Sequence, residues 1–206
     1  VKVRMPYLKT LRPRQWTKNL IVFAAPLFGF SINLQTIAGS ILAFVLFCCA
    51  SSSFYLINDI IDVEADRRHP VKCKRPIAAG LIPIPVAIAI GLLGSALVVG
   101  WLNSPGLGMT ITGYALLQVA YNLKLKKTVV LDIVAIAMGF VLRAYGGAAA
   151  ANISLSAWFI LCTAMLALFL GIEKRKAELR LADLKGGTSR VVLWRYSHAL
   201  LGRMES

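Results

Sequence analysis

Acidic residues are scarce in this sequence: nine Asp and Glu stand against 23 Lys and Arg, which gives a formal net charge of +14 at pH 7. Charged residues of both signs make up only 16% of the 206 residues, where about 25% is usual for a soluble domain. The four cysteines form no CxxC pair and no Cys/His spacing typical of zinc, so we expect them to be small buried side chains. These scarcities exclude an ordinary soluble enzyme and a zinc-binding module.

Hydrophobic residues, in contrast, make up 58% of the chain, and the mean hydropathy is +0.71. A nucleic-acid-binding protein can be this basic, but it does not contain long apolar runs, so we expect no nucleic-acid partner. A membrane span needs about 20 mostly apolar residues. Six segments predict spans: 20–31, 37–57, 85–102, 107–123, 129–150 and 155–172. The sequence therefore predicts an all-α, polytopic transmembrane helix bundle.

The positive charges indicate which ends of the spans face the cytoplasm. Of the 23 Lys and Arg, 22 precede the first span, lie in the loops after spans two and four, or follow span six. The intervening connections (32–36, 103–106 and 151–154) contain none. By the positive-inside rule, the N-terminus, the two basic loops and the C-terminal tail are predicted to be cytoplasmic. The polar, basic first 18 residues also predict that there is no cleaved signal peptide.

Some residues inside the predicted spans bear on packing. Gly91, Gly94 and the run Gly146-Gly147 predict places where helices approach closely. Arg143 is the single basic residue outside the cytoplasmic groups. It falls about 22 Å into span five at the helical rise, so it either reaches the far interface or pairs within the bundle, and we do not assign it to a site.

Acidic residues gather at the end of span two. Asp59, Asp62 and Asp66 have the spacing i, i+3 and i+7, which places them on one face of a continuing helix, with Asn58 beside them. Carboxylates this close repel one another unless a cation lies between them. Hard oxygen ligands are typical of Mg²⁺, which binds through one or two carboxylates and substrate phosphate.

Basic residues follow at once, and five Lys and Arg lie between positions 67 and 75. Guanidinium and ammonium groups are suited to phosphate. An alternative interpretation is a solvated loop that attracts anionic lipid. That alternative accounts for the bases but not for the carboxylates, which would repel the same lipid. The pattern therefore favours a Mg²⁺–diphosphate site.

The motif Asn58-Asp59-x-x-Asp62-x-x-x-Asp66 resembles the first aspartate-rich motif of the UbiA superfamily of intramembrane prenyltransferases. Residues 74–80, KRPIAAG, are similar to that family's RPI-x-x-G segment. Members of the family have nine transmembrane helices. The resemblance thus implies a UbiA-like fold with six of nine spans present in one domain, 1–206, and the last three helices missing.

The N-terminal segment 11–19, LRPRQWTKN, is similar to the opening of the branch that transfers phosphoribose to decaprenyl phosphate. Residues 121–126, YNLKLK, resemble the family's Tyr/Lys loop, and 173–179, EKRKAEL, the charged segment that replaces a second aspartate-rich motif in this branch. The resemblance implies that 5-phosphoribose moves from phosphoribosyl pyrophosphate to a polyprenyl phosphate in the plasma membrane, a step toward arabinose donors for the cell wall. A homo-oligomer is compatible with the sequence.

The resemblance also implies which residues form the catalytic and substrate-binding site. Asn58, Asp59, Asp62 and Asp66 are expected to be catalytic, the three aspartates as Mg²⁺ ligands. The expected substrate-binding residues are Lys18, Arg67, Lys74, Arg75, Tyr121, Lys124, Lys126, Asp132, Glu173, Lys174 and Arg175. The cytoplasmic segments that carry most of them are 1–18, 58–84 and 173–206. For Lys18, Lys124 and Lys126 the alternative role is to set the topology, and for 173–178 an exposed amphipathic tail.

Two other functions remain open from the sequence. The first keeps the fold and joins a prenyl diphosphate to an aromatic or glycerol-phosphate acceptor. The N-terminal segment and the lack of a DxxxD motif after span six favour the phosphoribosyl branch over it. The second is a transporter or a non-catalytic membrane protein. Transporters bind their substrates near the middle of the bilayer, whereas these carboxylates lie at its edge.

Overall fold

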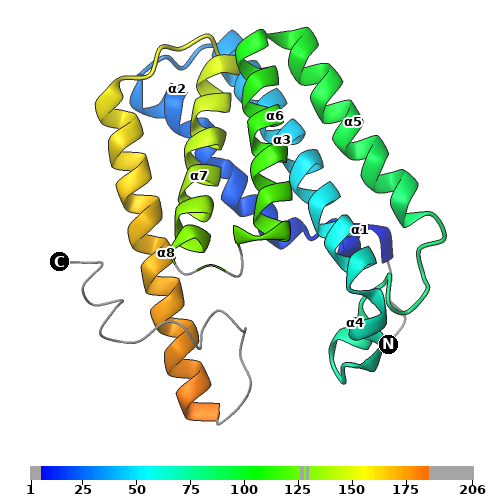
Figure 1. Cartoon of the computed structure of the whole chain (residues 1–206). Helices are drawn as coiled ribbons and strands as arrows, with labels where there is room; N and C mark the ends of the chain where they lie inside the picture. Colours follow the sequence, from blue (N-terminus) through cyan, green and yellow to red (C-terminus); the bar gives the residue numbers. More distant parts are fainter. Residues whose placement is uncertain (1–5, 126–127, 129, 186–206) are drawn as a thin grey trace.

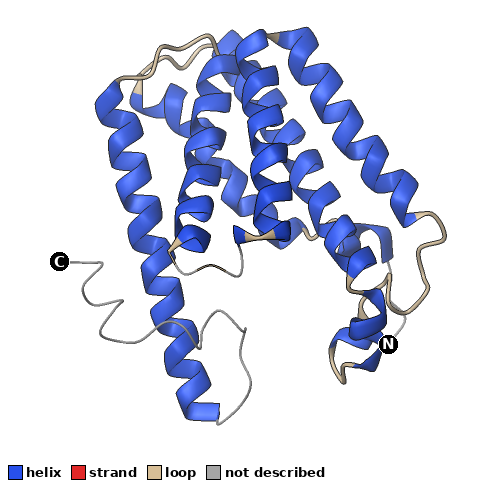
Figure 2. Cartoon of the chain, viewed as in Figure 1, coloured by secondary structure: helices blue, strands red, loops and turns tan. Residues whose placement is uncertain are grey.

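The computed structural model describes residues 6–125, 128 and 130–185. Within these ranges every regular element is a helix (Figure 2), which confirms the all-α prediction. The elements are α1 (Pro6–Thr10), η1 (Pro13–Phe23), α2 (Ala24–Phe28), α3 (Leu34–Ile61), α4 (Val63–Arg68), η2 (Lys72–Lys74), α5 (Pro85–Asn103), α6 (Pro105–Leu123), α7 (Leu131–Ala150) and α8 (Ala157–Lys185).

Local chemistry fixes where the long helices begin. The side chain of Asn33 accepts a hydrogen bond from the amide of Thr36 at 2.9 Å, and the Thr36 hydroxyl accepts from the amide of Asn33 at 3.1 Å. This capping box starts α3. α6 starts with Ser104 as its cap and Pro105 at its first position, where the missing N–H is harmless.

Four helices are long and apolar enough to cross a membrane: α3, α5, α7 and the part of α8 from Ala157 to Glu178. The more polar α6 lies within the fourth predicted span but is not among these four. The first predicted span, 20–31, is not one helix, because the 3₁₀ helix η1 is followed by the five-residue α2, which ends at Gly29. α8 continues beyond the sixth predicted span, through Lys185, so the charged segment 173–185 is helical. Residues 186–206 lie outside the described part.

The helices form one bundle whose connections alternate between its two ends (Figure 1). The connections 29–33 and 151–156 and the junction of α5 with α6 lie at one end, and these segments contain no Lys or Arg. α1 and α4 lie at the opposite end (Figure 1). The charged residues therefore collect at one end of the bundle, as the alternation of basic and uncharged loops predicts.

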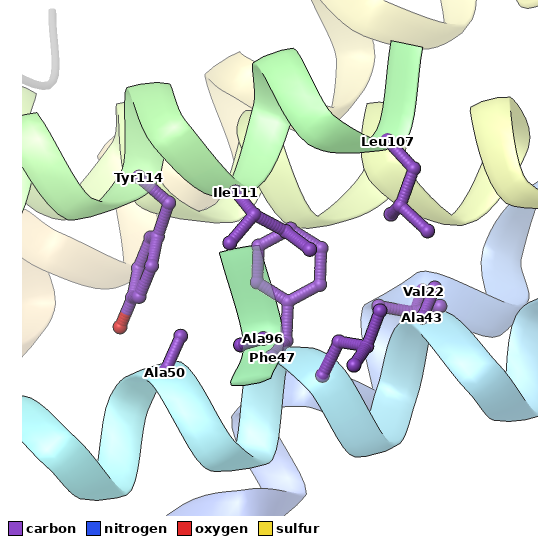
Figure 3. Packing of buried hydrophobic residues seen from close by; sticks show 9 residues of the cluster. Val22, Ala43, Phe47, Ala50, Ala96, Leu107, Ile111 and Tyr114 are labelled. Carbon is purple, nitrogen blue, oxygen red and sulfur yellow. The ribbon is translucent and has the colours of Figure 1, made fainter. Parts of the chain in front are cut away.

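The core is formed where α3 faces α6. Phe47 and Ala50 of α3 pack against Ile111 and Tyr114 of α6 (Figure 3). The rings of Phe47 and Tyr114 meet edge to face with centroids 5.6 Å apart, a favourable arrangement for aromatic pairs. Val22 of η1 lies in the same cluster, so the short N-terminal helices are part of the bundle.

Small residues on α7 allow this packing. A Cβ at Gly147 would lie 2.1 Å from the carbonyl oxygen of Val22, and one at Gly146 would lie 2.5 Å from the ring of Phe47. The prediction of close packing is thus confirmed for α7. It is wrong for Gly91 and Gly94 of α5, where nothing lies within 4 Å of an added Cβ, because these residues are on the open side of that helix.

Candidate active site

The aspartate-rich segment does not continue α3 as one straight helix. α3 ends at Ile61, and the backbone of Asp62 (φ −88°, ψ 6°) joins it to α4. The Asp62 amide still donates to the carbonyl of Asn58 at 3.0 Å, and the Asp66 amide donates to the carbonyl of Asp62 at 2.8 Å. Asp59 and Asp66 are buried as a result, while Asp62 is exposed. The predicted helix face required the three carboxylates to share one environment. In the structure they do not.

Arg75 joins the two buried carboxylates. Its Nη1 lies 3.1 Å from Oδ1 of Asp59 and 2.6 Å from Oδ2 of Asp66. The loop that carries Arg75 returns to the bundle because Ile77 and Ile82 pack on Leu56 of α3. We refer to Asp59, Asp66, Arg75 and their basic neighbours Arg12 and Lys72 as the Arg75 cluster.

Two further bases complete the Arg75 cluster. Arg12 places Nη2 2.5 Å from Oδ1 of Asp59, and its guanidinium lies over the ring of Tyr55 at 5.0 Å. Arg12 has a left-handed backbone (φ 54°) just before η1 begins. Lys72 lies 4.0 Å from Asp66. Neither residue is among the predicted site residues, although Arg12 belongs to the N-terminal motif and could have been found there.

The arginines of the Arg75 cluster are partly exposed. The side chains of Arg12 and Arg75 are 30% and 33% exposed. In the part of the chain that the structure describes, no three His, Cys, Asp or Glu side chains stand together as a ready metal site. Arginine nitrogens instead contact Asp59 and Asp66. These arginines are accessible enough to turn toward a phosphate and leave the carboxylates to another cation.

A second group of charges joins α7 to α8. Nε of Arg175 lies 2.8 Å from Oδ2 of Asp132, and its Nη1 bonds to Glu178. Arg175 is fully buried, and its Nη2 has no hydrogen-bond partner among the described residues. We call Asp132, Arg175 and Glu178 the Arg175 cluster. The structure thus brings together Asp132 and Arg175, which were predicted separately, and it places Glu178 of the charged segment 173–179 beside them.

The remaining predicted residues surround these two clusters. Arg67 donates from Nε to the carbonyl of Ala78 at 3.2 Å, so it supports the loop that carries Arg75. Glu173 pairs with Lys176 at 3.5 Å, and Lys174 lies 3.9 Å from Glu178. Asn58 and Tyr121 are half-buried, Lys18, Lys74 and Lys124 are exposed, and Lys126 lies outside the described residues.

Tyr55 belongs beside the Arg75 cluster, because the guanidinium of Arg12 lies over its ring at 5.0 Å. The Arg75 cluster comes from the N-terminal half of the chain, whereas the Arg175 cluster comes from α7 and α8.

Comparison with known proteins identifies the family of the chain. Residues 20–187 match the UbiA prenyltransferase family. The decaprenyl-phosphate phosphoribosyltransferase of Mycolicibacterium smegmatis is 46% identical over 94% of this chain, and that of Corynebacterium glutamicum is 41% identical over 94%. The chain spans 63% and 60% of the length of these two proteins.

A solved structure is similar in fold. The UbiA homologue from Archaeoglobus fulgidus, bound to DMAPP and Mg²⁺, superposes with a TM-score of 0.73. The likeness covers 97% of this chain and 71% of that one, at 21% sequence identity. At this identity the similarity establishes the helical fold.

Proposed function

The chain belongs to the UbiA prenyltransferase family, and from this membership we propose that it transfers 5-phosphoribose from phosphoribosyl pyrophosphate to a polyprenyl phosphate. The observation that carries the proposal is the 46% identity to a decaprenyl-phosphate phosphoribosyltransferase over 94% of this chain. The Arg75 cluster supports it, because three basic side chains, those of Arg12, Lys72 and Arg75, surround Asp59 and Asp66 and are suited to an anionic substrate. The product would be a phosphoribosylated lipid, an early intermediate for cell-wall arabinan.

The proposed reaction exchanges one phosphate ester for another at C1 of the ribose. An oxygen of the lipid phosphate forms the new bond to C1 while the bond from C1 to pyrophosphate breaks, and the electron pair leaves with pyrophosphate. The transition state has oxocarbenium character, as in other glycosyl transfers. The acceptor is already an anion, so no general base is needed. The protein must hold two anions together and stabilise the charge that leaves.

Asp59 and Asp66 would hold Mg²⁺, and the exposed Asp62, with Asn58, would join them only when the ion is bound. The donor set fits this ion, because carboxylate oxygens are its preferred ligands. Nη1 of Arg75 contacts both Asp59 and Asp66, so one cationic position already serves two carboxylates. Among the described residues Asp62 has no ion pair. A bound Mg²⁺ would neutralise charge on the departing pyrophosphate.

The arginines and lysines of the open end would hold the donor. Once Arg75 turns from the carboxylates, its planar guanidinium can bind two phosphate oxygens at once. Arg12 can do the same from the other side of Asp59. Lys74 is exposed next to Arg75, and Arg67 keeps their loop in place.

The lipid phosphate needs a cation close to the membrane surface. Lys18 is exposed in the middle of η1, and Lys124 is exposed directly after the end of α6. We assign both, with Lys126, to this anion. The polyprenyl chain itself would remain in the membrane.

The Arg175 cluster would form the far wall of the donor pocket. Asp132 and Tyr121 would face the ribose, whose hydroxyl groups are donors and acceptors of hydrogen bonds. Lys174 and Glu173 flank Arg175 on α8. We assign these residues to substrate binding, and we place the N-terminus and the charged loops on the cytoplasmic side, where a soluble sugar phosphate is available.

Radiolabel transfer tests the proposal. Membranes carrying this chain are incubated with labelled phosphoribosyl pyrophosphate, polyprenyl phosphate and Mg²⁺, and label is counted in the butanol-extractable lipid. Parallel membranes carry the Mycolicibacterium smegmatis relative as a positive control. Metal-dependent label in the lipid fraction supports the proposal. Label from the relative but none from this chain contradicts it, and incorporation from a labelled prenyl diphosphate would point to a prenyl donor.

A further inference from the structure

Arg143 is a buried cation without a carboxylate partner. It lies in the middle of α7, one of the candidate membrane spans, and is 7% exposed. Within the described residues no Asp or Glu lies within ion-pair distance of it, whereas Arg175 has two such partners. A charge buried in a membrane protein is expensive and is commonly functional. Of the two alternatives given by the sequence, pairing within the bundle is therefore correct.

Neutral groups hold the guanidinium of Arg143. Its Nε donates to Oδ1 of Asn19 at 2.7 Å, and its Nη2 donates to the hydroxyl of Tyr114 at 2.9 Å. The guanidinium also lies over the ring of Tyr114 at 4.6 Å and near that of Phe140 at 5.6 Å. A Cβ at Gly139 would lie only 3.2 Å from Nη1, so this glycine makes room for the side chain. Arg143 is therefore fixed in both position and direction.

Asn19 connects Arg143 of α7 to α3. It is completely buried in η1. Its Nδ2 lies 3.2 Å from Sγ of Cys48 and 3.4 Å from Oγ of Ser51, both on α3. A single amide thus joins three helices, and it uses both its acceptor and its donor to do so.

A second polar contact holds the start of η1 on the same helix. Nε1 of Trp16 donates to Oγ of Ser52 at 3.0 Å, and this hydroxyl donates to the carbonyl of Leu11 at 2.9 Å. Leu11 precedes Arg12, which contacts Asp59. The position of Arg12 in the Arg75 cluster therefore depends on how η1 lies along α3.

We infer that Arg143 is a positioning residue, which fixes η1 against α3 through Asn19 and thereby keeps Arg12 at the Arg75 cluster. The effect on catalysis rests on the proposed function, whereas the effect on the position of η1 does not. It depends on the two directed N–H groups of the guanidinium, which a lysine cannot reproduce. Arg143 would touch neither the donor nor the lipid phosphate.

The test compares Arg143→Met, Arg143→Lys, Asn19→Leu and the double variant Arg143→Met/Asn19→Leu in membranes. Lys9→Met serves as the matched control, because Lys9 is an exposed base of α1. Steady-state transfer gives KM for phosphoribosyl pyrophosphate and kcat. The rate at which N-ethylmaleimide labels Cys48 is measured in a background with Cys49, Cys73 and Cys162 changed to alanine. The labelling reports on the contact between Asn19 and Cys48 without any substrate.

We expect Arg143→Met to raise KM about tenfold with kcat within about twofold, since it weakens donor binding and not the chemical step. Cys48 labelling should accelerate by about tenfold, because Asn19 no longer holds η1 over it. Arg143→Lys and Asn19→Leu should match Arg143→Met, and the double variant should be no worse than either single one. Lys9→Met should change nothing.

Three results would overturn the inference: normal KM in Arg143→Lys, unchanged Cys48 labelling in Arg143→Met, or additive effects in the double variant. The first would indicate that charge alone matters, as for direct anion binding. A parent chain without any transfer activity would contradict the proposed function instead. In that case the labelling rates alone would decide whether Arg143 holds η1 through Asn19.

Discussion

The Arg75 and Arg175 clusters use the same chemistry in opposite surroundings. In both, one guanidinium contacts two carboxylates. The side chain of Arg75 is 33% exposed, whereas that of Arg175 is 1% exposed. An exposed arginine can exchange carboxylate for phosphate at little cost, while a buried one would leave uncompensated charges behind. The difference teaches that ion-pair geometry alone does not show which arginine can exchange its carboxylate partners for a phosphate.

Removal of the metal should give the largest difference between the two clusters, because it should abolish activity and leave stability unchanged. EDTA should abolish lipid labelling, because the carboxylates of the Arg75 cluster then lack the ion that holds pyrophosphate. Added Mg²⁺ should restore labelling, and the thermal midpoint of the detergent-solubilised protein should not change, since the Arg175 cluster contains its own cation. Label transfer in EDTA equal to that in Mg²⁺ would rule out a metal role for these aspartates.

Asp59→Asn should reduce kcat/KM at least about a hundredfold, the size expected when a group that stabilises the transition state is removed. Glu64→Gln, at an exposed acid of the adjoining α4, is the matched control and should stay within about twofold of the unmodified chain. Equal losses in the two variants would mean that negative charge, and not this carboxylate, is what the open end requires.

Arg175→Met should lower the free energy of unfolding. Breaking a buried ion pair by removing one partner costs about 3–5 kcal/mol, and Asp132 stays buried after its guanidinium partner is removed. Arg75→Met should cost less, since Arg12 and Lys72 still lie beside Asp59 and Asp66 after Arg75 is removed. Size-exclusion chromatography after heating in detergent measures both. The comparison fails if Arg75→Met lowers the thermal midpoint as much as Arg175→Met does.

Lys72→Met should have the smallest effect. Lys72 lies 4.0 Å from Asp66, and its side chain is 48% exposed, so the pair contributes at most about 1 kcal/mol. We expect KM for phosphoribosyl pyrophosphate to rise less than about threefold, and less at high salt, where surface charges are screened. A tenfold rise would make Lys72 a donor ligand in its own right.

The sequence was sufficient to group three members of the Arg75 cluster, because they are close in the chain, whereas Arg12 and Lys72 were not predicted. Asp59, Asp66 and Arg75 fall within one helix end and the loop that follows it, so their spacing alone predicts a common site. The exposure of Asp62 could not be predicted in this way, because it depends on where α3 turns into α4. A periodicity argument assumes a straight helix.

The long-range pairs were beyond such reasoning. Asp132 and Arg175 were each expected in the site, but nothing in the sequence states that they pair across 43 positions. Arg143 and Asn19 are 124 positions apart, and the partner of Arg143 depends on how η1 crosses α7. The approximate positions of the long helices followed from apolar runs and charges, whereas these contacts follow from tertiary packing. The 3₁₀ conformation of η1 was missed for the same reason.

The contact between Gly147 and the Val22 carbonyl also limits how this sequence can drift. At 2.1 Å from that oxygen, even one added carbon would occupy space that the backbone of η1 already fills, so every missense change in this codon should be purged. Codons 91 and 94 meet no such barrier and are free to exchange glycine for alanine or serine. In relatives whose η1 packs against α7, we therefore expect position 147 to be glycine in every sequence, while positions 91 and 94 vary.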